Sequence, residues 1–199
     1  CPRCGGRQLS KFQIIVYTEL KSIFKNIKLA DKSTAYELDV FEKDLNFAVE
    51  IDSFRYHQNK VASDKKKNEF FKKQNINIFR IREKGLKKIS VSDIEYKDVI
   101  IRHDKAYQKK LINNLLKNIK EKITSKNIKK RIERYIIKET LQNEKEFLKI
   151  NDSIPGPLKG NSLEERFPEI AKEFHPTKNG SLKPDMLSRG SDNKVWWLC

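Results

Sequence analysis

The spacing of hydrophobic and polar residues in the first half of the chain predicts helices and strands in alternation. Residues 10–26 place apolar side chains at helical intervals, with Ser10 as a candidate N-cap, which favours a helix with one buried face. Residues 36–41 and 46–52 alternate around the polar break EKDL, which is typical of two strands of a hairpin. Further elements are expected as a helix at 63–74, a strand at 75–83 and a short strand at 98–103.

The second half reads as two long amphipathic helices followed by a linker and a small separate unit. One helix face is formed by Leu111, Leu115, Leu116, Ile119 and Ile123, and the next by Ile128, Ile132, Tyr135 and Ile136. Residues 151–162 hold two prolines and two glycines, which indicates a linker, and Ser162 with Glu165 forms a capping-box pattern. We therefore predict an α/β (α+β) fold with a small mixed central sheet, flanking helices and long C-terminal helices.

Composition adds a partner class to this picture. Lys and Arg number 43 against 27 Asp and Glu, a formal charge of +16, and such an excess favours a polyanion, most commonly nucleic acid. The alternative is a generally basic proteome, because Lys, Asn and Ile are all abundant. No segment approaches the roughly 18–20 apolar residues of a membrane span and no signal peptide is visible, so we expect a cytoplasmic protein without a membrane partner.

Two Glu-x-Asp pairs interrupt the apolar strands of the predicted hairpin. Side chains two apart in a strand share a face, so Glu37 with Asp39, and Glu50 with Asp52, can bring up to four carboxylates together. Such a cluster repels itself unless a cation is present, and oxygen ligands suit Mg²⁺. The alternative is that these carboxylates face solvent on a half-exposed hairpin.

Further polar residues near the hairpin are candidates for the same site. His57 follows the second strand and can act as a general base or acid, although a lone histidine is commonly a surface residue. Asp64 and Lys67 lie three apart on the next helix and share a face, as a site pair or as a surface ion pair. Glu19 either borders the inner face of the first helix or points into the site.

This order of motifs resembles the restriction-endonuclease-like (PD-(D/E)XK) superfamily, in particular its very-short-patch-repair endonuclease-like branch. The resemblance covers roughly residues 10–103 and is carried by Glu37-x-Asp39, Glu50-Ile-Asp-Ser53, the polar positions after it, and INIFRIRE. It implies that Asp39 is the first metal-binding acid and that Glu50 is the acid of the second motif.

The resemblance also assigns the remaining candidates and exposes two departures. His57 and Asp64 match polar positions of this branch, and Glu19 matches an acid of its first helix. Asp52 stands where many relatives have the Lys that positions water, and Ser53 stands where Gly is usual; Lys67 or His57 would have to replace that Lys. Candidate contacts to nucleic acid are Arg55, Lys60, Lys66, Arg80 and Arg82.

The cysteines predict zinc at both ends of the chain. Cys1-Pro-Arg-Cys4 has the spacing of half a zinc site, which needs four ligands, and three cysteines do not indicate a disulfide framework. Residues 162–199 resemble the start of a bacterial treble-clef or zinc-ribbon repeat. This resemblance implies that Cys199 is the first ligand of one site and that Cys1 and Cys4 close another, so we expect more chain on both sides.

Together these features predict a Mg²⁺-dependent endodeoxyribonuclease that zinc ribbons place on duplex DNA. The alternatives are a catalytically inactive DNA-binding relative and a zinc-ribbon interaction scaffold. The expected domains are the end of a preceding ribbon (1–8), the endonuclease-like domain (9–103), a helical extension (104–150), a linker (151–161) and the start of a ribbon repeat (162–199).

Overall fold

The computed structural model of the chain describes residues 9–97, 104–153, 157, 160–180, 182–188, 191 and 193–198. These residues belong to two compact units, one spanning Leu9–Asn151 and one containing the part from Asp152 onward. The predicted mixed α+β fold class is confirmed. The strand expected at 98–103 and the zinc ligands expected at Cys1, Cys4 and Cys199 lie outside the described residues.

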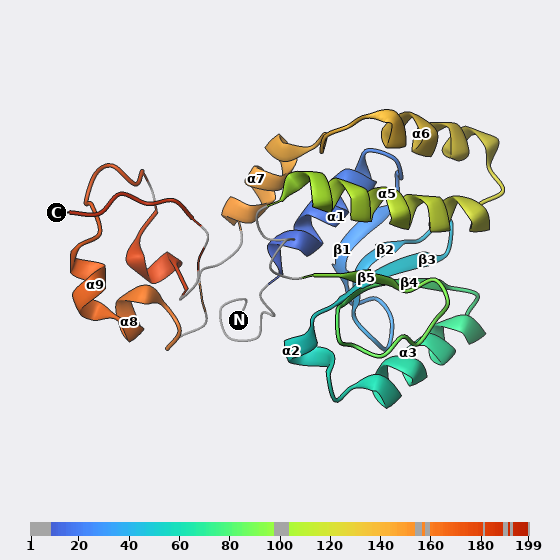
Figure 1. Cartoon of the computed structure of the whole chain (residues 1–199), viewed down its shortest axis with the longest axis horizontal. Coiled ribbons are helices and arrows are strands. Elements are labelled where there is room, and N and C mark those ends of the chain that lie inside the picture. Colours follow the sequence, from blue (N-terminus) through green and yellow to red (C-terminus); the bar gives the residue numbers. More distant parts are fainter. Residues whose placement is uncertain are drawn as a thin grey trace. The chain divides into compact units, whose positions relative to one another are not determined.

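The larger unit is built on a five-stranded mixed sheet in the order β1-β2-β3-β4-β5 (Figure 1). Its strands are β1 (Ile27–Asp31), β2 (Leu38–Glu42), β3 (Phe47–Asp52), β4 (Asn77–Glu83) and β5 (Ile94–Tyr96). The first three strands pair antiparallel, whereas β3, β4 and β5 run parallel. The predicted hairpin is therefore confirmed as β2 and β3, while β1 and β5 are strands that the sequence pattern did not indicate.

The helices lie on both sides of this sheet (Figure 1). They are α1 (Lys11–Lys21), α2 (Phe54–His57), α3 (Val61–Lys73), α5 (Lys105–Lys122), α6 (Lys126–Ile137) and α7 (Glu144–Ser153). A parallel strand pair needs a long crossover, and α2 with α3 supplies the one between β3 and β4. The predicted helices at 10–26 and 63–74 are thus confirmed with shorter or shifted bounds, and Ser10 caps α1 by accepting from the Gln13 amide.

The main hydrophobic core lies between the sheet and the helices α1, α5 and α6. Val49 and Phe79 of the sheet pack there with Leu20 of α1, Leu115 of α5 and Ile132 of α6, all buried. The long helices that the sequence places outside the sheet domain therefore share its core. This face of the sheet uses the odd positions of β3 and β4, so the even positions point to the other face, toward α3.

The C-terminal unit contains two short helices, α8 (Leu163–Arg166) and α9 (Pro168–Lys172), and a 3₁₀ turn, η1 (Pro184–Met186). The predicted capping box is present: the Ser162 hydroxyl accepts from the Glu165 amide and the Glu165 carboxylate accepts from the Ser162 amide. Phe174 stacks edge-on against Trp197. None of the described helices is long and apolar enough to cross a bilayer.

Candidate functional site

The even positions of β3 and β4 gather charged residues on the face of the sheet that α3 covers. Glu50 lies opposite Arg80 in the parallel register, and Asp52 lies opposite Arg82. All four side chains are buried, with at most 4% of their surface exposed. Buried charges are costly unless they are paired, so their partners define what this face can do.

Asp39 of β2 and Glu50 of β3 lie side by side where the ladder between their strands ends. The backbone pairing stops at Val40 and Val49. The next amides donate to carboxylate side chains instead of to backbone carbonyls. The Ile51 amide donates to Asp39 Oδ2 at 2.8 Å, and the Asp39 amide donates to Glu50 Oε1 at 3.2 Å. The predicted convergence of these two carboxylates from neighbouring strands is therefore confirmed.

The two neighbouring carboxylates affect each other's protonation. Burial and the charge of Glu50 raise the pKa of Asp39 from its ordinary 3.8 to about 7, against the opposing effects of the Ile51 amide and the Lys67 charge. Burial is the largest cause of this shift, and the negative charge of Glu50 adds to it. A hard divalent cation compensates such charge through oxygen ligands, so Asp39 and Glu50 are a fitting donor pair for Mg²⁺.

We expect Asp39→Asn to stabilise the metal-free chain at about pH 8 by about 1–2 kcal/mol, because Asp39 remains partly accessible and its full shift is screened. Its raised pKa means that the folded state holds a proton the unfolded state has lost, so the stability of the wild type falls as pH rises from about 4 to 7. Asn still accepts from the Ile51 amide.

Urea unfolding in EDTA measures this effect. The gain in unfolding free energy should be present at about pH 8 and vanish near pH 4, where Asp39 is protonated in both states. A gain of the same size at both pH values would show that charge repulsion is not its cause.

Lys67 of α3 brings an ammonium group to the carboxylate pair. Its Nζ donates to Glu50 Oε2 at 2.5 Å and to the Glu37 carbonyl at 2.6 Å. The inner face of α3 carries Asp64, Lys67, Asn68 and Phe71, which lie three or four residues apart and so share one face. The sequence left open whether Lys67 is a site residue or part of a surface ion pair, and the structure places it at the site.

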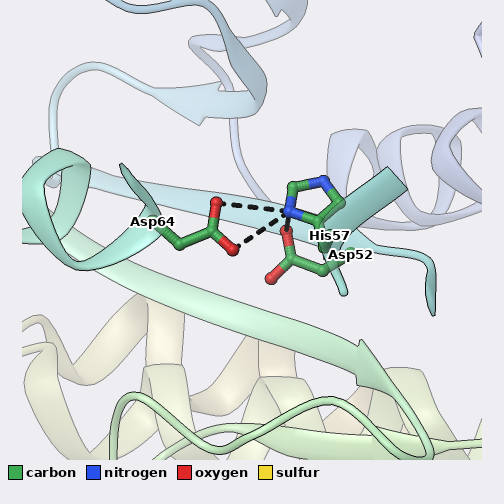
Figure 2. Close-up of side chains that lie close together, drawn as sticks. All are labelled: Asp52, His57 and Asp64. Carbon is green, nitrogen blue, oxygen red and sulfur yellow. Dashed lines mark hydrogen bonds and ion pairs between the residues drawn. The ribbon is translucent and has the colours of Figure 1, made fainter. Parts of the chain in front are cut away.

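A second charged group forms around Asp52, His57 and Asp64, whose nearest ligand atoms all lie within 4.8 Å (Figure 2). His57 Nδ1 lies 3.1 Å from Asp64 Oδ2 and 3.3 Å from Asp52 Oδ1. Figure 2 shows Nδ1 turned toward the two carboxylates and the other ring nitrogen turned away. The sequence named His57 and Asp64 as separate candidates for the site and paired Asp64 with Lys67, whereas the structure brings Asp64 into contact with His57.

Arginines already neutralise the aspartates of this second group. Arg80 Nη1 donates to both oxygens of Asp52 at 2.8 Å. Arg82 Nη1 donates to Asp52 Oδ2 at 2.5 Å and to Asp64 Oδ2 at 3.3 Å. Burial raises the pKa of Asp64, but the hydrogen bond and charge of His57, the charge of Arg80 and the hydrogen bond of Arg82 outweigh burial and lower it.

These contacts correct two sequence expectations, those for Arg80 and Arg82. Asp52 was expected to join the magnesium ligands, which stays a prediction: with His57 and Asp64 it offers ligand atoms close enough to hold a metal ion, and its oxygens also accept from guanidinium groups. Arg80 and Arg82 were expected to contact nucleic acid, but they are 1% and 2% exposed and face Asp52. The alternation in NIFRIRE places both arginines on one face, but their partner follows only from the β3–β4 register.

Within the described residues, the carboxylates of Glu19 and Glu37 have partners other than Asp39 and Glu50. Glu19 accepts from the Tyr135 hydroxyl at 2.6 Å and from the Gln142 and Asn143 amides at 3.0 and 2.8 Å, on the side of the sheet that α1 and α6 cover. The sequence left two placements open for Glu19, and the structure places it at the border of the inner face of α1. The Glu37 carboxylate lies 3.7 Å from Lys32 Nζ, just before β2 begins, so the strand pattern that paired it with Asp39 does not hold.

Exposed aromatic and basic residues border the site on α2. Phe54 and Tyr56 are 40% and 63% exposed, and Arg55 lies between them with its guanidinium 5.6 Å from the Tyr56 ring. Lys60 and Lys66 are also exposed. The structure thus places Arg55, Lys60 and Lys66 at the surface, and their contact with nucleic acid stays a prediction.

Comparison with known proteins finds a family match for one part of the chain, near its C-terminal end. Residues 170–199 match a family described as a probable treble clef zinc finger domain, which supports the predicted zinc module at the C-terminal end. No curated protein and no solved structure matches the chain. In that unit His175 Nδ1 accepts from the Thr177 and Lys178 amides, so this nitrogen stabilises the turn that follows His175.

Proposed function

We propose that the larger unit is a Mg²⁺-dependent endonuclease that hydrolyses phosphodiester bonds in duplex DNA. The observation that carries this proposal is the contact of Glu50 with both Asp39 and Lys67. It combines two acidic oxygen ligands and one ammonium group on a single face of the sheet. Metal-assisted hydrolysis of a phosphodiester needs this combination of an oxygen-rich cation site and a positioned cation.

The charge balance of the two groups of acidic residues supports the choice of Asp39 and Glu50 as the metal ligands. Asp52 and Asp64 are matched by Arg80 and Arg82, so that group needs no added cation when His57 is neutral. Within the described residues, the ion pair of the Asp39–Glu50 group is the one between Glu50 and Lys67, and the charge of Arg80 also acts on Glu50. Burial, followed by the charge of Glu50, raises the pKa of Asp39. Mg²⁺ at Asp39 and Glu50 would supply the positive charge that polarises a phosphoryl oxygen and activates water.

The side chains of this chain then handle orientation and proton transfer. Lys67, held by Glu50 and the Glu37 carbonyl, places its positive charge where a phosphate would meet the carboxylates. The two aspartates facing Nδ1 of His57 favour a proton on that nitrogen, which leaves the lone pair of Nε2 to accept a proton. His57 is therefore our candidate general base, with Asp64 as its positioning residue.

The arrangement also explains why Asp52 replaces the usual lysine of the second motif. Lysine at this position would face the buried guanidinium of Arg80, and like charges in a buried site repel. Aspartate instead pairs with Arg80, and Lys67 brings the ammonium group from α3. This departure therefore does not weigh against catalysis.

Nucleic acid fits the surroundings of the site. Exposed aromatic rings next to cations are a platform on which bases can stack, and the exposed lysines of α3 can neutralise phosphates. We further propose that the C-terminal unit binds zinc through Cys199 and helps to place the nuclease on DNA, since its residues match a zinc-finger family.

Nicking of supercoiled plasmid by the full chain tests the proposed activity. We expect relaxed circles to accumulate with Mg²⁺ and none to form in EDTA. Plasmid that stays supercoiled at every Mg²⁺ concentration while the chain binds it would favour the inactive DNA-binding alternative instead.

A further inference from the structure

The positive charge of the chain is concentrated in one pair of helices away from the proposed catalytic site. Residues 104–138, which include α5 and α6, hold 12 basic and 3 acidic residues, or +9 of the formal +16. These helices pack on the face of the sheet that carries Val49 and Phe79. Asp39 and Glu50 lie on the other face, so this charge is not part of the candidate nuclease site.

An open hollow of about 440 Å³ lies between α5 and the end of α6. Its cations are Lys109, Lys110, Lys117 and Lys138, and Asn113 and Asn114 add amide groups; Glu139 is its one acidic residue. Within the described part of the chain, Lys110, Lys117 and Lys138 form no ion pair. We call this set of residues the α5–α6 hollow.

Lys109 forms a buried positive floor for the α5–α6 hollow. Only 2% of its surface is exposed. Among the residues that the structure describes, the hydrogen-bond acceptors of its Nζ are neutral, namely Asn113 Oδ1 at 2.6 Å and the Tyr135 carbonyl at 3.1 Å. The Nζ also lies 3.9 Å from the centre of the Tyr135 ring. Burial lowers the pKa of Lys109, the charge of Glu19 raises it, and that of Lys138 lowers it. A buried ammonium without a directly paired anion is costly, and an anion bound in the hollow would offset that cost.

The contact with Lys109 also orients Asn113. Because its Oδ1 accepts from the ammonium, the amide nitrogen of Asn113 remains to donate two hydrogen bonds. Lys110 and Lys117 lie two turns apart on α5, about 10 Å along the axis. This matches the rise of about three base pairs at 3.4 Å each, so the two ammonium groups can reach different phosphates of one strand.

We propose that the α5–α6 hollow binds the phosphate backbone of duplex DNA as an anchor separate from the cleavage site. Cations with amide donors are the groups that contact phosphate oxygens without reading bases. The choice of DNA as the source of the phosphates rests on the proposed function, whereas the anion site rests on the hollow itself. Contact on a second face lets the chain hold DNA while the nuclease site is free.

Duplex binding in EDTA tests the anchor without any need for cleavage. The variant combines Lys110→Gln, Lys117→Gln and Lys138→Gln, and the matched control combines Lys25→Gln, Lys43→Gln and Lys145→Gln, which are equally exposed. We expect the hollow variant to lose about 10- to 30-fold in affinity and to reduce the salt slope by about 2–3, as loss of three phosphate contacts predicts. The control should change affinity less than about 3-fold.

Equal losses in both triple variants would show that the charge acts diffusely and would overturn the anchor. Unchanged duplex binding with weaker binding to anionic lipid vesicles would overturn it in favour of a membrane surface. A chain that cuts no DNA but shows the expected loss would reject the nuclease and keep the anchor. Thermal unfolding of each variant confirms that the exposed substitutions leave the fold intact.

Discussion

Replacing Asp39 or Glu50 by alanine is expected to abolish Mg²⁺-dependent nicking, with a loss of at least about 10³-fold in rate. Each carboxylate is one of two acidic ligands in the proposed cation site, and a catalytic metal contributes several kcal/mol to the transition state. Duplex affinity in EDTA should stay within about 3-fold, because neither carboxylate contacts DNA in its absence. Gel-resolved plasmid nicking and a fluorescence binding assay measure the two quantities.

Glu37→Gln is the matched control for this loss. Its carboxylate lies beside Lys32, and only its backbone carbonyl reaches Lys67. The control should therefore nick plasmid at close to the wild-type rate. Full nicking by both alanine variants, or equal loss in the Glu37→Gln control, would reject the assignment of Asp39 and Glu50.

Replacing Lys67 by methionine is expected to slow nicking by about 10²-fold, at the lower end of what a positioned catalytic group contributes. Methionine keeps an unbranched side chain as far as Cε but removes the ammonium that contacts Glu50. Lys66→Met removes the same charge from the neighbouring, exposed position of α3 and should lower duplex affinity slightly without changing the rate at saturating DNA.

The two lysine variants separate catalysis from binding. Single-turnover rates at saturating DNA should differ by about the same 10²-fold between them. If both variants nick equally fast at saturation, Lys67 contributes only charge to DNA binding and has no part in the proposed catalysis.

Local patterns predicted much of the fold of the larger unit. The alternation in β2 and β3 and the apolar face of α5 were visible because each buries one face against the core. The strand β1 was missed because only its two end residues are buried, so IKLAD shows no alternation. The preceding helix was also expected to reach residue 26, whereas α1 ends at Lys21 and a turn intervenes. The short strand β5 owes its position to pairing with β4, which no local pattern records.

The candidate site was predictable where neighbouring strands meet in a hairpin. Asp39 and Glu50 could be placed together because a short turn fixes which residues of β2 and β3 face each other. The pairing of Arg80 and Arg82 with Asp52 depends on the register between β3 and β4, which are joined by two helices. Sequence reasoning therefore assigned these arginines to the surface, where arginine is usually found.

Glu19 shows a related limit of the sequence. A glutamate among apolar residues of α1 indicated a special role, and the structure supplies it as an acceptor for Tyr135 and for backbone amides that follow α6. Those partners lie more than 100 residues away in the chain. The sequence could identify the unusual residue but not its partners.

Binding of Mn²⁺ to the full chain, followed by electron paramagnetic resonance, tests the central claim most directly, since Mn²⁺ prefers the same oxygen ligands as Mg²⁺. The account predicts a bound Mn²⁺ signal that Mg²⁺ displaces and that Asp39→Asn or Glu50→Gln weakens at least about 10-fold, the effect of losing one charged ligand. Asp52→Asn should leave it nearly unchanged, because Arg80 and Arg82 already hold Asp52. A signal that both carboxylate variants retain in full would contradict the account.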